Sequence, residues 1–90
     1  MDKFKIAETE SFVKKIESPE YKRLYTKIST YVYPLLRRNP YYGPNIKRLK
    51  GQYSDYYRYR IGDYRLLYTI RSDKIMVFII DISHRKNAYE

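Results

Sequence analysis

The pattern of hydrophobic and polar positions predicts a strand, then two helices, then a group of strands. Phe4 and Ile6 alternate with Lys3 and Lys5, which is the period-two pattern of a short, half-buried strand. Apolar residues then recur at helical spacing, and the last third of the chain returns to strand patterns. The predicted elements are a strand over 2–7, a short helix after Thr9, a longer helix over 21–36, and strands over 56–61, 64–71 and 74–83.

Local signals set the ends of the helices. Thr9 is a suitable capping residue for the first helix, which should end before Ser18. Pro34 lies inside the second helical pattern, where it removes a hydrogen bond and should kink or break the helix. Residues 39–54 hold two of the four prolines and two of the three glycines. We therefore expect a loop there, with a brief extended piece at 46–49.

The last three strand patterns predict an antiparallel meander. They are separated at hairpin spacing by turn residues at 62–63 and 72–73. The segment 74–83 is apolar on both faces, which places it inside the sheet rather than at an edge. We predict one domain over residues 1–90 with an α+β fold, in which two N-terminal helices pack on one face of a mainly antiparallel four-stranded sheet in the order β-α-α-β-β-β.

The amino-acid composition excludes several classes of site and favours an anionic partner. The chain has 19 Lys plus Arg and 10 Asp plus Glu, a net charge of +9. The absence of cysteine excludes disulfides, thiolate zinc sites and a cysteine nucleophile. No membrane span or signal peptide is evident, so we expect a cytoplasmic protein. Of the aromatic residues, 13 are Tyr and 3 are Phe. A basic chain rich in Tyr suits RNA, although Tyr can also replace Phe in a small core.

Strand alternation gathers three arginines on one face of the predicted sheet. Arg58 and Arg60 share one face of their strand, and Arg65 faces the same way on the next strand if the turn at 62–63 is tight. Guanidinium groups repel one another, and their planar fork suits phosphate, so such a cluster indicates an anion site. The alternative is an ordinary solvated sheet face with surface arginines.

The sequence lacks the motifs of metal-dependent, nucleotide-binding and serine-nucleophile enzymes. The aspartates of the sheet region show no metal-ligand spacing, and there is no phosphate-binding glycine motif and no nucleophile elbow. We therefore expect neither a metal nor a cofactor. RNA supplies its own nucleophile, the 2′-hydroxyl, so cleavage requires orientation, proton transfer and charge neutralisation. His84, which follows the buried strand, is the candidate for proton transfer, and a structural role is the alternative.

The segment from Leu49 to Tyr89 resembles the RelE branch of the RelE/ParE toxin superfamily. The most specific strings are RIGDYRLLY and HRKNAY, and the order of elements also matches over essentially the whole chain. The resemblance implies the toxin of a type II toxin-antitoxin module with a RelB-like antitoxin. It also implies an endoribonuclease that cleaves mRNA in the ribosomal A site without metal, leaving a 2′,3′-cyclic (or 3′) phosphate and a 5′-hydroxyl.

The resemblance also implies roles for particular residues. Arg58 and Arg60 match a basic pair, Arg65 matches the arginine of the family's GYR or DYR motif, and Arg85 matches the arginine that follows the last strand. Tyr89 matches a tyrosine thought to stack on the nucleotide being cut, and its hydroxyl could instead donate a proton. The predicted catalytic residues are Arg65, Arg85, His84 and Tyr89. This chain differs from the family pattern at the basic pair, where some members have lysines. Arginine is a poor general base, so the resemblance does not identify the residue that accepts the proton of the 2′-hydroxyl. Further RNA contacts are expected from basic residues nearby in the chain: Lys47, Arg48, Lys50 and Lys86.

Two other functions remain as alternatives. The ParE branch shares the fold but inhibits DNA gyrase, and Arg65, Arg85 and Tyr89 together argue against it. A catalytically silent protein that binds RNA or an antitoxin would keep the basic face without acid-base groups.

Overall fold

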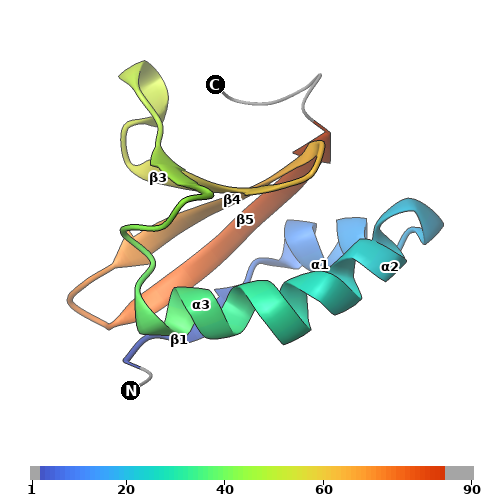
Figure 1. Ribbon diagram of the computed structural model, residues 1–90, viewed down its shortest axis with the longest axis horizontal. Coiled ribbons are helices and arrows are strands. Elements are labelled where there is room, and N and C mark those ends of the chain that lie inside the picture. Colours follow the sequence, from blue (N-terminus) through green and yellow to red (C-terminus); the bar gives the residue numbers. More distant parts are fainter. Residues whose placement is uncertain (1–2, 85–90) are drawn as a thin grey trace.

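The computed structural model describes residues 3–84 and shows a helical layer on one face of a twisted sheet (Figure 1). Its elements, in chain order, are β1 (Lys5–Glu8), α1 (Glu10–Ile16), α2 (Pro19–Lys27), the π-helical turn η1 (Ile28–Val32), α3 (Tyr33–Arg38), β2 (Ile46–Arg48), the 3₁₀ turn η2 (Gly51–Tyr53), β3 (Tyr56–Ile61), β4 (Tyr64–Arg71) and β5 (Met76–His84).

The sheet confirms the meander but has one strand more than predicted. Within the described residues it contains five strands in the order β1-β5-β4-β3-β2. β1 runs parallel to β5, and the other neighbours are antiparallel. β5 lies in the interior, as its apolar faces predicted. The prediction of four strands was wrong because β2, with three residues, is too short to show a period. It forms the brief extended piece of the loop, and its pairing with β3 makes it a strand.

The helices begin and end for local reasons. The Thr9 hydroxyl accepts a hydrogen bond from the Phe12 N–H at 3.3 Å, which confirms the predicted cap of α1. α2 starts at Pro19, two residues earlier than the predicted start at Tyr21, because proline fits the first turn of a helix. The interruption expected at Pro34 is a π-helical turn just before it. No helix of the described chain is long and apolar enough to cross a membrane.

The main core lies between the helices and the sheet. Tyr68, at its centre, is fully buried, and its hydroxyl donates a hydrogen bond to the Pro40 carbonyl oxygen at 2.7 Å. Burial raises the pKa of Tyr68 well above its ordinary value. The fully buried apolar side chains around it include Phe12, Ile28, Val32, Leu36, Leu66, Val77, Ile79 and Ile82.

A carboxylate at the end of β1 ties the sheet to the helices. Glu8 Oε2 accepts hydrogen bonds from the hydroxyls of Tyr25 and Tyr33, each at 2.7 Å. Burial, and then the hydrogen bond to Glu8, raises the pKa of Tyr25 to about 12 and also raises that of Tyr33. One side chain therefore fixes β1 against both α2 and α3.

We expect Glu8→Ala to lower the free energy of unfolding by about 2–3 kcal/mol, because it leaves the buried Tyr33 hydroxyl without its charged acceptor. Urea unfolding measures the loss. Glu10→Ala is the matched control, since the side chains of Glu10 and Lys14, 3.6 Å apart, are 86% and 74% exposed, and such pairs contribute about 0.5 kcal/mol or less. Equal stabilities of the two variants would show that the hydrogen bonds of Tyr25 and Tyr33 to Glu8 do not stabilise the fold.

Candidate nucleic-acid interface

Basic side chains lie in register on the sheet face that points away from the helices. Arg60 pairs with Arg65 across β3 and β4, and Arg65 pairs with Ser83 on β5. Arg58, two residues before Arg60, pairs with Lys47 on β2. Directly opposed residues in an antiparallel pair share a face. The structure thus brings together the three arginines that strand alternation placed on one face, and it adds Lys47 beside them.

Local backbone features hold these arginines in place. Gly62 has a φ of +57°, which glycine adopts without strain, and it closes the two-residue turn that sets Arg60 opposite Arg65. Arg58 Nη1 donates a hydrogen bond to the Asn45 carbonyl oxygen at 2.8 Å. Arg60 is exposed, whereas Arg58 and Arg65 are half-buried. A rigid sheet therefore presents several cationic groups side by side, an arrangement suited to phosphate oxygens.

His84 lies at the end of β5 but on the other face of the sheet. It pairs with Tyr64, and the centroids of the two rings are 5.3 Å apart in an edge-to-face contact. Tyr64 packs against the helix-side core, where its ring also contacts Tyr21. The imidazole is therefore a packing neighbour of Tyr64, and its placement does not bring it to the face that carries Arg65.

The remaining predicted residues divide among several places. Lys47 is exposed beside Arg58, but Arg48 pairs with Tyr57 and so lies on the opposite face, where its Nε donates to the Ser54 carbonyl oxygen at 2.8 Å. Lys50 is exposed just before η2. Three predicted residues lie outside the described part of the chain: Arg85, Lys86 and Tyr89.

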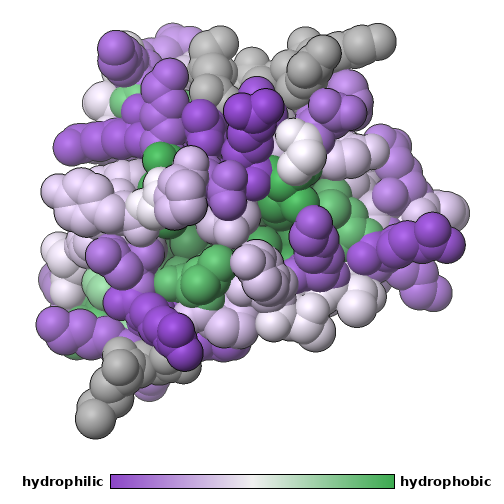
Figure 2. All heavy atoms as spheres, viewed as in Figure 1, coloured by the Kyte–Doolittle hydropathy of each residue, from purple (hydrophilic) through white to green (hydrophobic). Residues whose placement is uncertain are grey.

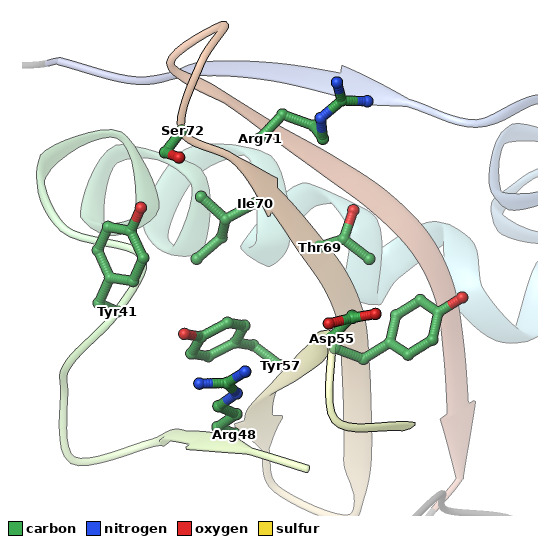
Figure 3. A pocket seen from close by; sticks show the side chains of 9 residues that line it. Tyr41, Arg48, Asp55, Tyr57, Thr69, Ile70, Arg71 and Ser72 are labelled. Atoms are coloured by element: carbon green, nitrogen blue, oxygen red, sulfur yellow. The ribbon is translucent and has the colours of Figure 1, made fainter. Parts of the chain in front are cut away.

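A cleft of about 500 Å³ lies at the far end of β3 and β4 (Figure 3). Its lining includes Tyr41, Tyr57, Arg48 and Arg71, and the rings of the two tyrosines meet edge to face with centroids 6.1 Å apart. Four residue steps along the strands, about 13 Å, separate it from the Arg60–Arg65 pair. Of the residues that line this cleft, only Arg48 was predicted from the sequence as a site residue. The cleft forms because the loop after α3 folds back beside the sheet, and no local pattern in the sequence shows that arrangement.

Comparison with known proteins shows to which protein family the chain belongs. The model of a family described as the ParE toxin of the type II toxin-antitoxin system parDE matches residues 6–89. No curated protein matches the chain.

Solved structures share the fold. The toxin-antitoxin complex RelBE2 from Mycobacterium tuberculosis matches with 24% identity and a TM-score of 0.77, covering 97% of each chain. The archaeal RelE-RelB complex from Pyrococcus horikoshii matches with 23% identity and a TM-score of 0.66, covering 96% of this chain and 99% of that one. The DinJ-YafQ complex from E. coli matches with 16% identity and a TM-score of 0.72, covering 98% and 99%.

The family model spans nearly the whole chain, and the solved toxins share its fold over nearly their full length. The chain therefore belongs to the ParE toxin family of the RelE/ParE superfamily, the toxins of type II toxin-antitoxin systems.

Proposed function

We propose that this toxin is a metal-independent endoribonuclease that cleaves mRNA in the ribosomal A site. The observation that supports it best is the pairing of Arg60 with Arg65 on the helix-free face, with Arg58 on the same face. In-line attack by a 2′-hydroxyl places extra negative charge on the phosphorus oxygens. Fixed guanidinium groups stabilise that charge more strongly in the transition state than in the bound substrate.

The positions of the basic residues on the sheet suggest that they contact different phosphates of the RNA. Arg65 lies on the central strand β4 and is half-buried, so its guanidinium is well fixed for the reacting phosphate. Arg58 and Lys47 lie farther from the turn and suit a neighbouring phosphate. None of these groups is a general base, because arginine stays protonated and lysine is cationic at neutral pH.

Proton transfer and base stacking are proposed for the C-terminal segment. Arg85 follows β5 directly and would add a second charge at the reacting phosphate, and Tyr89 would stack on the base. Lys86 would contact the RNA backbone. His84 is the sequence-based candidate for proton transfer, but its ring packs against Tyr64 on the face of the sheet opposite Arg65, which favours the structural role.

We propose a RelB-like antitoxin as the partner, because solved toxins of this fold are described as complexes with antitoxins. A toxin that acts on ribosomes would work in the cytoplasm. The second candidate function is inhibition of DNA gyrase, which is favoured by the description of the matching family as ParE toxins.

Two assays on the purified chain separate these functions. We expect cleavage of mRNA on programmed ribosomes to continue in excess EDTA and to leave a 5′-hydroxyl, because the nucleophile belongs to the RNA and the charge is stabilised by arginine. We also expect gyrase supercoiling activity to be unchanged at the same concentrations. Inhibited supercoiling with intact mRNA would favour the gyrase function, and inactivity in both assays would favour the silent binding protein.

A further inference from the structure

One small polar side chain is buried beside the proposed reaction site. Ser83, on β5, is 4% exposed and is the only buried residue of the described chain whose side chain is polar and not aromatic. Figure 2 shows the usual distribution, with hydrophobic residues gathered between the helices and the strands and hydrophilic residues around them. Within residues 3–84, the buried Ser83 Oγ has no hydrogen-bond partner. A buried hydroxyl without a partner destabilises a fold, so its retention at this position calls for a physical reason.

The strand register places Ser83 directly opposite Arg65. The two residues pair across β4 and β5, so both lie on the sheet face that points away from the helices. The Cβ atoms of directly opposed residues are about 5 Å apart, which brings a hydroxyl within reach of a guanidinium group. Arg65 Nη1 is itself a buried atom, so part of this guanidinium lies against the protein. Arg60, opposite Arg65 on its other side, has no hydrogen-bond acceptor in its side chain.

The donors of Arg65 are numerous enough to serve both a phosphate and this hydroxyl. A guanidinium has five N–H donors in a fixed fork, and a bidentate contact with phosphate uses two of them. Ser83 Oγ can accept one of the others. Because Oγ is buried, an RNA phosphate that approaches from solvent does not reach it, and its effect on the reaction has to pass through Arg65. Hydrogen bonds that serve catalysis often become short only in the complex with substrate.

We propose that Ser83 is a positioning residue for Arg65, whose guanidinium donates a hydrogen bond to the Ser83 hydroxyl when a phosphate group is bound. This role deepens the proposed function and rests on it. A guanidinium held in one plane stabilises the transition state most, because the charge on the phosphate oxygens is largest there. The free toxin then carries the unpaired hydroxyl as a loss of stability, which is typical of residues kept for function.

Ser83→Ala separates this role from a structural one, because the two roles predict different changes. Removal of an unpaired buried hydroxyl should leave the melting temperature unchanged or raise it. The single-turnover rate of cleavage of ribosome-bound mRNA should nevertheless fall about tenfold, since the guanidinium loses the group that orients it. The ribosome concentration that gives half the maximal rate should change less than about twofold, because binding in the ground state is affected little.

Thr69→Val is the matched control for the loss of a hydroxyl. Thr69 lies on β4, four residues after Arg65 and by alternation on the same face, and it is half-buried. The change removes a hydroxyl at nearly constant side-chain volume, and we expect the cleavage rate to stay within about twofold of the wild type. Ser83→Thr keeps the hydroxyl and should cleave faster than Ser83→Ala.

A double-mutant cycle tests whether Ser83 acts through Arg65. In the Arg65→Ala background, Ser83→Ala should lower the residual cleavage rate no further, because the group that the hydroxyl orients is already absent. A second loss of about tenfold in that background would mean that Ser83 acts independently of Arg65, and the positioning role would be wrong.

A measurement without cleavage distinguishes failure of this inference from failure of the proposed function. In saturating inorganic phosphate, the NMR signals of the Arg65 Nη–H groups report rotation of the guanidinium about its Nε–Cζ bond. We expect separate signals in the wild type and averaged signals in Ser83→Ala. If this difference is seen but the wild type cleaves no mRNA, the positioning role stands and the nuclease function falls. If the wild type cleaves mRNA and Ser83→Ala matches it in cleavage rate or in these signals, the positioning role falls and the nuclease function remains.

Discussion

Replacement of Arg65 by alanine should reduce cleavage of ribosome-bound mRNA by about 100-fold or more, since it removes a fixed charge that acts on the transition state. The same change should affect stability much less, because Arg65 lies outside the helix-side core. Single-turnover cleavage rates and melting curves on the same preparations measure the two effects.

Arg71→Ala is the matched control for this experiment. Arg71 lies on the same strand and, by alternation, on the same face as Arg65, but it is at the opposite end and pairs with Asp73 at 3.2 Å. We expect it to keep most of the cleavage rate. Equal losses in the two variants would mean that the total positive charge of the face matters and that Arg65 has no particular role at the reacting phosphate.

The strands that carry the site were predictable because their signals are local. β3 and β4 begin and end at the predicted residues. Their alternation is regular, and the turn between them contains the Gly62 that a tight hairpin needs. The convergence of Arg58, Arg60 and Arg65 follows from alternation and that turn alone, so it required no knowledge of tertiary contacts.

β5 shows where alternation fails. Its register against β4 shifts between Leu67 and Tyr68, so that Leu67 pairs with Asp81 and Tyr68 pairs with Ile79. The extra residue between them lets Ile79 and Ile82, three positions apart, both reach the core. The same shift sets the face of His84. A β-bulge in a continuous apolar run leaves no periodic trace, so the sequence could not show that His84 packs against Tyr64.

The cleft could not be predicted because it depends on the loop after α3. Two long-range contacts hold that loop in place, the Tyr68 hydroxyl to the Pro40 carbonyl and Arg58 to the Asn45 carbonyl. Each joins residues that are more than ten positions apart in the sequence. The sequence showed a loop rich in proline, glycine and tyrosine, but the surfaces it forms are set by these tertiary contacts.

Stability should fall steeply above about pH 10, because buried tyrosines resist ionisation. The pKa values of Tyr33 and Tyr68 are raised, first of all by burial. Above the ordinary tyrosine pKa of about 10, the unfolded chain loses these protons while the folded chain keeps them. The unfolded state then binds fewer protons, so the free energy of unfolding falls by about 1.4 kcal/mol per pH unit for each group, or roughly 3 kcal/mol per pH unit for the two groups together.

Tyr68→Phe isolates one of these contributions. The variant loses the hydrogen bond to Pro40 and starts from a lower stability at neutral pH, but one titrating group is missing from its unfolded state. Between about pH 10 and pH 11.5 its stability should therefore decline less steeply than that of the wild type, by about 1.4 kcal/mol per pH unit. Tyr42→Phe should keep the wild-type slope, because Tyr42 is exposed in the folded chain. Urea unfolding at a series of pH values measures the slopes. Identical slopes for Tyr68→Phe and the wild type would show that the Tyr68 hydroxyl titrates in the folded protein as it does in the unfolded chain, which would contradict its burial at the centre of the core.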